Sequence, residues 1–181
     1  MLLSDADAID EGTTVQAAIA GEPGAFAELF HRHHPMIHAF AFRLCLDRTT
    51  AQDIAQETFI KAARAIGGYR AGTPFRHWLY RICANTARDW QRGEGRRRRL
   101  ADAAQLRAET DSAERPPAFD AAREALAALP AEQRAAVVAV YFEELSHAEA
   151  ARVLGCAEAT VSWRIFIAKR ILKNLLTRHE R

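Results

Sequence analysis

The chain has 181 residues and a formal net charge of +2, with nine Gly, six Pro and three Cys. This length allows one medium domain or two small ones. No apolar run approaches the roughly 18 residues of a membrane-spanning helix, and the acidic N-terminus lacks the regions of a signal peptide. The cysteines, Cys45, Cys83 and Cys156, are far apart and form no CxxC pair, which argues against a disulfide framework or a Cys-based metal site. We therefore expect a cytoplasmic protein with reduced, mostly buried thiols.

Helix is the predicted secondary structure throughout. Alanine is abundant, Gly and Pro are few, and no segment shows period-two alternation bounded by turn signals. We predict an all-α protein with two small helical domains joined by a flexible linker. The expected segments are an acidic N-terminal tail with a short helix (1–24), a first helical domain (25–95), a linker (96–119) and a second helical domain (120–181).

Charge is distributed unevenly along the chain. Residues 1–24 hold five acids and no Lys or Arg, whereas residues 67–99 hold nine Arg against two acids. Residues 158–181 hold six basic residues against two acids. Two separate basic segments are typical of a protein that contacts nucleic acid at two places.

The N-terminal quarter begins with an acidic, unpatterned segment. We expect residues 1–12 to form a loose tail, followed by a short helix over 13–20. A longer helix is predicted over 25–46, interrupted or kinked at Pro35. Four histidines surround this proline: His31, His33, His34 and His38. His34 and His38 have the spacing of helical metal ligands, but no carboxylate or cysteine completes a set. We interpret all four as surface and boundary residues.

A third helix is predicted over residues 51–66, with Thr49 and Thr50 suited to cap it and Gly67-Gly68 to end it. Its buried side is expected to consist of Ile54, Ala55, Thr58, Phe59, Ala62 and Ile66. The opposite side carries Asp53, Gln56, Glu57, Lys61 and Arg64 around the apolar Ile60. An apolar side chain ringed by acids and amides is typical of a protein-binding surface, although single exposed apolar residues also occur without such a function.

The next segment, residues 75–99, predicts an amphipathic helix that follows a loop and starts at Thr73-Pro74. Its apolar side consists of Phe75, Leu79, Ile82, Cys83, Thr86 and Trp90, and its cationic side of His77, Arg81, Asn85, Arg88 and Arg92. Such a row can follow a phosphate backbone, with Trp78 and Tyr80 at its edges as platforms for unpaired bases. The alternative is a solvated amphipathic helix that ends in a basic loop. We do not extend the helix beyond Gly93 and Gly95.

The second domain begins after a segment with mixed charge. Helices are predicted over 120–129 and 131–142, separated by Pro130, with Val137, Val138, Val140 and Tyr141 mostly buried. Ser146 and Glu149 form a capping-box pattern at the start of a helix over 147–154. A turn at Gly155-Cys156 and a last helix over 158–176 complete a helix-turn-helix.

The last helix has an apolar side and a mixed outer side. The expected inward residues are Val161, Ile165, Ala168, Leu172 and Leu175. The expected outward residues are Thr160, Ser162, Trp163, Phe166, Lys169, Arg170 and Lys173. Such an outer side can enter a major groove and contact phosphates at once, while the alternative is a plain helical hairpin with a hydrophilic surface.

Four motifs occur in order along the chain: FAELFHRHHP, AQDIAQETFIKAAR, FRHWLYRICANTARDW and ALAALPAEQRAAVVAVYFEELSHAEAARVLGCAEATVSWRIFIAKRIL. With them, residues 25–176 closely resemble the extracytoplasmic-function (ECF) group of bacterial sigma factors. The resemblance implies two helical domains, called sigma2 and sigma4, with no catalysis, no cofactor and no metal. It also implies a partner, core RNA polymerase, and recognition of the minus-ten and minus-thirty-five promoter elements with opening of the duplex.

The resemblance assigns roles to individual residues. Polymerase binding, to the clamp helices of the largest subunit, falls to Asp53, Gln56, Glu57 and Ile60. Minus-ten DNA binding falls to Tyr69, Arg70, Arg76, His77, Trp78, Arg81, Asn85, Arg88 and Arg92. Minus-thirty-five DNA binding falls to Thr160, Ser162, Trp163, Arg164, Phe166, Lys169 and Arg170. The polymerase flap is a further implied contact, and the linker matches a segment that runs toward the active site and RNA exit path.

Three positions depart from the common pattern of this group. Ser162 and Ile167 stand where many relatives carry basic residues, and Trp163 replaces a small one. We therefore expect weaker phosphate or guanine contacts and an altered promoter preference. Because the chain stops soon after the last helix, we expect control by a separate anti-sigma factor or by abundance rather than by an appended domain.

Two other classes of protein compete with this interpretation. A free-standing helix-turn-helix repressor or activator would bind duplex DNA alone as a dimer, and it has no need of the surface over 53–64 or the row over 75–99. An enzyme is disfavoured because the sequence has no Gly-rich phosphate loop, no convincing metal set and no recognisable pair of nucleophile and base.

Overall fold

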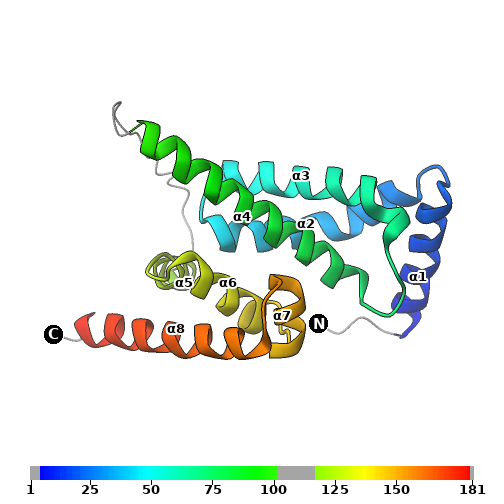
Figure 1. The fold of residues 1–181 in the computed structure, drawn as a ribbon. Helices are drawn as coiled ribbons and strands as arrows, with labels where there is room; N and C mark the ends of the chain where they lie inside the picture. The colour runs from blue at the N-terminus through cyan, green and yellow to red at the C-terminus, as the bar shows by residue number, and fades with distance from the viewer. Residues whose placement is uncertain (1–4, 102–116, 180–181) are drawn as a thin grey trace.

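A computed structural model of the chain describes residues 5–101 and 117–179, and in these two ranges every regular element is helical. The N-terminal unit consists of α1 (Asp5–Ala20), α2 (Ala25–Cys45), α3 (Arg48–Ala65), the short 3-10 helix η1 (Ile66–Gly68) and α4 (Phe75–Ala101). The C-terminal unit consists of α5 (Pro117–Ala127), α6 (Ala131–Val137), the π-helical turn η2 (Val138–Phe142), α7 (His147–Leu154) and α8 (Glu158–His179). The prediction of an all-α chain with two helical units is confirmed (Figure 1).

Helices α2, α3 and α4 pack together and form the core of the N-terminal unit. The pattern of α3 explains its place there, because residues three and four apart lie on one face of a helix. The six residues predicted for that face are all buried: Ile54, Ala55, Thr58, Phe59, Ala62 and Ile66. Because this face is buried, the opposite face of α3 is exposed to solvent.

Helix α1 corrects the expectation of a loose N-terminal tail. Residues 5–12, which were expected to be part of the tail, are helical, and residues 1–4 lie outside the described part. The helix packs against α2, with Val15 buried and with Glu11 Oε1 3.0 Å from the Nε2 atom of His33. Tertiary packing of this kind stabilises helices whose sequence alone is a weak helix signal. It also makes His33 a buried residue rather than one at the surface.

Helix α2 continues through Pro35, so the predicted interruption is wrong. The proline ring lies on the exposed side, while His33, Ile37 and Phe40 on the opposite side are buried. Packing of that side offsets the hydrogen bond that proline cannot donate.

The start of α3 is capped by Asp47, which is not among the predicted caps. The carboxylate of Asp47 accepts a hydrogen bond from the backbone N–H of Thr50 at 2.7 Å, so Asp47 takes the place predicted for Thr49 or Thr50. Hydrogen bonding to Thr50, first by its side chain and then by its backbone N–H, lowers the pKa of Asp47. An aspartate is among the best N-cap residues because its side-chain oxygen satisfies a free helix donor.

Helix α4 runs past Gly93 and Gly95 to Ala101, beyond its predicted end. A glycine in a helix costs about 1 kcal/mol relative to alanine, which weakens a helix without forbidding it. Residues 96–101 of the expected linker are therefore helical, and residues 102–116 lie outside the described part.

The C-terminal unit contains the predicted helix-turn-helix with one local surprise. Ser146 and Glu149 form the capping box of α7, and Gly155 closes that helix with a φ of 65°, as predicted. Before it, the backbone N–H of Glu143 bonds to the carbonyl of Val138 across a π-helical turn. Tyr141 lies inside this turn, where the backbone departs from the 3.6-residue period on which the prediction rests. Tyr141, predicted to be buried, is therefore 53% exposed.

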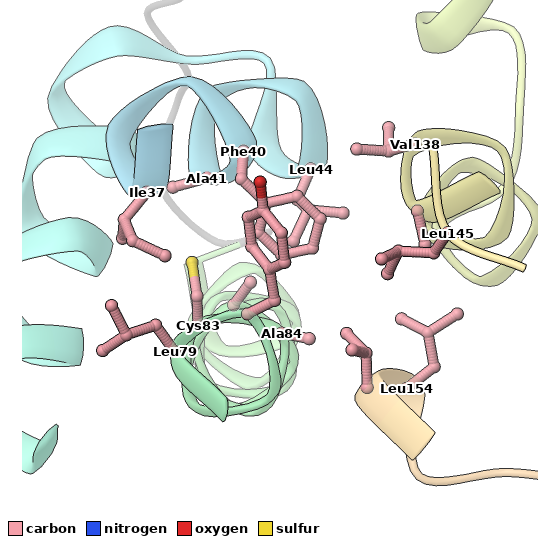
Figure 2. Close-up of a cluster of buried hydrophobic side chains, with 14 of the residues drawn as sticks. Ile37, Phe40, Ala41, Leu44, Leu79, Cys83, Ala84, Val138, Leu145 and Leu154 are labelled. Carbon is pink, nitrogen blue, oxygen red and sulfur yellow. The ribbon is translucent and has the colours of Figure 1, made fainter. Parts of the chain in front are cut away.

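The two units share an apolar contact. In Figure 2, Val138, Leu145 and Leu154 of the C-terminal unit face Phe40 and Leu44 of α2 and Ala84 of α4. These side chains are all buried. Helix α7 packs against α4, and α6 against α2, so the C-terminal unit lies along one side of the N-terminal unit (Figure 1).

Candidate functional site

The outer side of α3 has the composition expected of a protein-binding surface. Asp53 and Gln56 are exposed. Ile60, four residues after Gln56 along the helix, is 39% exposed. Glu57 is half-buried, with an oxygen 3.6 Å from the Nζ atom of Lys61. We call Asp53, Gln56, Glu57 and Ile60 the α3 surface. An apolar side chain surrounded by exposed acid and amide groups is suited to docking a partner of opposite charge.

The cationic side of α4 is only partly open. We call the seven α4 residues to which the resemblance assigns minus-ten DNA binding the α4 stripe: Arg76, His77, Trp78, Arg81, Asn85, Arg88 and Arg92. Of these, Arg81, Asn85 and Arg92 are exposed, so an open row of polar and cationic side chains remains along the helix. Arginines spaced along one face can follow the phosphates of a single strand.

Two residues of α4 correct the sequence interpretation. Tyr80, expected to be a stacking platform, is 3% exposed and donates a hydrogen bond to the carboxylate of Glu143. His77, expected on the solvent side, is 5% exposed, and its Nδ1 atom lies 3.9 Å from an oxygen of Glu149. Burial lowers the pKa of His77, which keeps the imidazole neutral near pH 7. Both residues face the C-terminal unit. The helical periodicity of α4 cannot predict that a distant part of the chain packs there.

The loop between η1 and α4 is held in shape by aromatic contacts. The ring of Tyr69 lies 5.4 Å from those of Phe75 and Trp78, and its hydroxyl donates a hydrogen bond to the carbonyl of Thr73 at 2.5 Å. Gly72 has a φ of 119°, a conformation that side chains rarely adopt. The loop is therefore pre-shaped, and Trp78 serves as one wall of it rather than as a free platform.

A cleft of about 760 Å³ lies between this loop and the C-terminal unit. Its N-terminal wall includes Tyr69, Arg70 and Arg81, and its C-terminal wall includes Glu149 and Arg152. The cleft combines aromatic and cationic side chains, which is the chemistry that holds an unstacked nucleotide.

The outer side of α8 is fully presented to solvent. We call Ser162, Trp163, Phe166, Lys169 and Arg170 the α8 face, and all five are exposed. Trp163 and Phe166 are each 57% exposed, and the guanidinium of Arg170 lies 5.9 Å from the Phe166 ring centre. The helix is supported from behind by the buried Val161, Ile165 and Ala168. A supported helix with exposed aromatic and cationic groups has the geometry of a major-groove binder.

Two of the residues predicted to contact the minus-thirty-five element lie away from this open face. Arg164 forms an ion pair with Glu132 of α6, and burial lowers its pKa. Thr160 is half-buried at the start of the helix. The structure therefore gives Arg164 a role in joining α8 to α6.

Several contacts between the units involve residues that sequence reasoning missed. The side chain of Glu143 is 7% exposed, and one of its oxygens lies 3.0 Å from the Nη1 atom of Arg43 while the other accepts the hydrogen bond from Tyr80. Arg88 donates to the backbone carbonyl of Leu154 at 2.8 Å. These partners are 63 to 100 residues apart, so no local motif could have found them.

The chemistry of the site is that of binding surfaces. Among residues 5–101 and 117–179, no group of three or more His, Cys, Asp or Glu side chains is arranged to hold a metal ion. The three cysteines are free, and Cys83 is buried whereas Cys45 and Cys156 are half-buried. Within the same ranges, each helix is too short or too polar to cross a bilayer.

Comparison with protein families matches both units. Residues 29–97 match the family Sigma-70 region 2, and residues 119–172 match Sigma-70, region 4. The ECF RNA polymerase sigma factor SigM of Mycobacterium tuberculosis is 37% identical over 163 residues, which cover 88% of this chain and 81% of SigM. The RNA polymerase sigma-H factor of Pseudomonas aeruginosa is 34% identical over 176 residues, which cover 90% of this chain and 91% of that factor.

Solved structures with both units are also similar. The sigma factor RpoE in complex with the anti-sigma factor NepR from Bartonella quintana has a TM-score of 0.73 and 26% identity, over 85% of this chain and 98% of RpoE. CnrH in complex with the cytosolic domain of CnrY has a TM-score of 0.67 and 26% identity, over 92% of this chain and 96% of CnrH. The chain therefore belongs to the ECF group of RNA polymerase sigma factors, which are non-enzymatic proteins that direct the initiation of transcription at promoters.

Proposed function

We propose that the three surfaces described above divide the work of a sigma factor. The α3 surface attaches the chain to core RNA polymerase, the α4 stripe with the Tyr69 loop holds the melted minus-ten strand, and the α8 face contacts the minus-thirty-five duplex.

The α3 surface supports the polymerase assignment by its composition and its separation from the basic helices. Ile60 supplies apolar area, and Asp53 and Glu57 supply negative charge in a molecule whose other two surfaces are cationic. A polymerase helix with basic and apolar side chains fits this pattern, and the clamp helices of the largest subunit are the proposed partner. Because the DNA-binding surfaces carry the opposite charge, they repel a basic polymerase helix, and the acidic α3 surface repels DNA.

The α4 stripe is suited to a single strand rather than to a duplex. Arg81, Asn85 and Arg92 supply an open row on α4, and the Tyr69 loop borders a cleft large enough for an extruded base. Removing a base from the stack costs a few kcal/mol, so a melted promoter needs both a pocket for the base and cations for its strand.

The α8 face is suited to a duplex. Trp163 and Phe166 can contact thymine methyl groups in the major groove, and Lys169 and Arg170 can contact phosphates beside it. The half-buried position of Arg164 leaves this face with fewer cations than the sequence predicts. We therefore propose that apolar contacts carry more of the base recognition than guanine hydrogen bonds do.

The observation that carries the proposal is the exposed α3 surface. A free-standing helix-turn-helix regulator has no use for an acidic and apolar helix side on a separate unit. One further partner follows from the family. RpoE was solved with the anti-sigma factor NepR, and we propose that a separate anti-sigma factor binds this chain also. We place the protein in the cytoplasm, where polymerase and promoter DNA are found.

The double variant Asp53→Arg with Glu57→Arg tests the polymerase assignment. We expect affinity for core polymerase to fall by at least about thirtyfold, because interface hot spots contribute about 2 kcal/mol or more each. Run-off transcription from a promoter library should fall with it, and the helical signal in circular dichroism should stay unchanged.

The matched control is Glu22→Arg with Glu28→Arg, which makes the same change of charge at two exposed positions outside the α3 surface. It should leave polymerase binding intact. Normal association of the Asp53 and Glu57 variant would show that the polymerase binds elsewhere. Tight sequence-specific duplex binding by the isolated wild-type chain, without any effect on polymerase, would favour the free-standing regulator.

A further inference from the structure

The contact between the two units is centred on one carboxylate. Glu143 follows the π-helical turn of the C-terminal unit and inserts its side chain between α2 and α4 of the N-terminal unit. Arg43 and Tyr80 each engage one of its oxygens. Burial raises the pKa of Glu143, and the two partners oppose that shift, so the carboxylate is held there by specific contacts against a desolvation cost.

Apolar side chains surround this polar centre. Leu145 and Leu154 of the C-terminal unit are each at most 3% exposed, and they pack against Phe40, Leu44 and Ala84 (Figure 2). In addition, the guanidinium of Arg43 lies 5.0 Å from the ring centre of Phe142. Removing this apolar area from water favours the arrangement in which the two units are in contact, which we call the closed arrangement. The buried carboxylate fixes how the two units are aligned with each other.

The closed arrangement uses groups of the α4 stripe. Arg88 donates to the carbonyl of Leu154, and His77 is buried beside Glu149. One edge of the stripe is therefore occupied by the chain itself, while Arg81, Asn85 and Arg92 stay open. A nucleic-acid strand that needs Arg88 has to displace the C-terminal unit.

The closed arrangement also conflicts with binding of a promoter at both elements. The minus-ten and minus-thirty-five elements lie about 25 base pairs apart, or about 85 Å at about 3.4 Å per base pair. In this structure α7, the helix before the α8 face, packs directly on α4. The two units therefore have to separate before both surfaces can engage one promoter.

We propose that Glu143, held by Arg43 and Tyr80, is an intramolecular latch that keeps the free sigma factor closed, with the C-terminal unit covering part of the strand-binding stripe until polymerase separates the units. This inference rests on the proposed function of α4. The match to RpoE in complex with NepR spans both units, so a sigma factor held by an inhibitor has a similar overall shape. This chain reaches that shape through its own contacts.

Two variants open the latch in different ways. Glu143→Lys places a cation beside Arg43, and Tyr80→Phe removes the hydrogen bond without changing charge or packing volume. Glu144→Lys is the matched control, because it makes the same charge change at the exposed neighbouring residue. Circular dichroism establishes that each variant keeps its helices.

Small-angle scattering of the full chain measures the closure. A compact chain of this length has a radius of gyration of about 16 Å. We expect wild type and Glu144→Lys to stay close to that value, and both latch variants to be larger by several Å.

Binding to a fluorescent single-stranded minus-ten oligonucleotide measures the covered surface. Relative to Glu144→Lys, Glu143→Lys should bind about tenfold tighter, and Tyr80→Phe should bind several-fold tighter than wild type. Equal size and equal affinity in latch variants and controls would overturn the latch. A larger radius with unchanged affinity would overturn the claim that closure covers the strand-binding stripe.

Run-off transcription with core polymerase separates the two hypotheses. If wild type directs initiation but the latch variants stay compact, the latch is rejected and the proposed function stands. If the latch variants expand but wild type directs no initiation, the proposed function is rejected and the closed arrangement stands.

Discussion

The chain carries two basic helices, and they differ in what surrounds them. The α8 face is exposed at all five positions, from Ser162 to Arg170. The α4 stripe is engaged by the C-terminal unit at His77 and Arg88. Two helices of similar composition are thus unequal in availability. Basic residues in a sequence predict where nucleic acid can bind, but the rest of the fold decides which of them are accessible in the free protein.

The α8 side of this comparison is expected to show the larger effect. Trp163→Ala removes an exposed aromatic group from a helix whose inner side stays packed, so folding is unchanged. We expect minus-thirty-five-dependent transcription to fall about tenfold or more, since a base contact contributes about 1–3 kcal/mol of discrimination. The dependence of binding on salt should not change, because no phosphate contact is lost.

Glu144→Ala is the control for this variant, because Glu144 is exposed on the same unit but lies outside the α8 face. Replacing thymine by uracil in the minus-thirty-five element removes only the methyl groups, and it should reduce wild-type activity more than that of Trp163→Ala. An equal loss in both proteins would contradict a role for Trp163 in contacting thymine.

A smaller effect is expected on the open part of the α4 stripe. Arg81→Ala should weaken binding of a single-stranded oligonucleotide several-fold, uniformly across sequences. The slope of log affinity against log salt should become shallower by about 0.7, the value for one phosphate contact on a single strand. Fluorescence anisotropy at several salt concentrations measures both quantities. Arg64→Ala on α3 should change neither, and an unchanged slope for Arg81→Ala would place the strand elsewhere.

The smallest effect is expected on the stability of the folded chain as pH changes. It depends on His77, which lies in the part of the α4 stripe that the C-terminal unit covers. The pKa of His77 is lowered from its ordinary value of 6.5, first by burial and then by Arg76 and Arg152, against an opposing effect of Glu149. An unfolded chain therefore takes up a proton below about pH 6.5 that the folded chain resists. The contribution of His77 to stability is full above that pH and declines as pH falls toward the lowered pKa.

Unfolding by denaturant at pH 7.5 and 5.5 measures this decline, and NMR titration measures the imidazole itself. His77→Gln should reduce the loss of stability between the two pH values. A His77 pKa at or above 6.5 in the folded chain would contradict the burial of this residue against the C-terminal unit.

Local patterns predicted the parts of the fold that depend on neighbours in sequence. The buried side of α3 follows from residues three and four apart, and the α7 cap follows from Ser146 and Glu149. The predicted cap of α3 was wrong by two or three residues, because Asp47 is as good a cap as a threonine. The roles assigned to the α3 surface, the stripe and the α8 face stay predictions, and the structure shows only where these residues lie.

Features that depend on distant partners were missed. Tyr80 has the periodicity of a stripe edge, yet it is buried because Glu143, 63 residues away, covers it. Tyr141 has the periodicity of a core residue, yet a π-helical turn rotates it outward. The first half of α1, residues 5–12, was assigned to a tail because its acidic sequence lacks a clear apolar side, whereas contact with α2 stabilises the whole helix. In each case tertiary contacts or an irregular turn override a local pattern.

The three cysteines have a practical consequence for future work. Burial raises the pKa of Cys45 to about 11 and that of Cys83 to about 12, and it also raises the pKa of Cys156. Since only the thiolate reacts readily with alkylating dyes, these native side chains are poor nucleophiles at neutral pH. A thiol introduced at an exposed position of each unit would react first. Spectroscopic probes can therefore be attached to the otherwise unaltered chain, and the separation of its units can be followed in real time as polymerase is added.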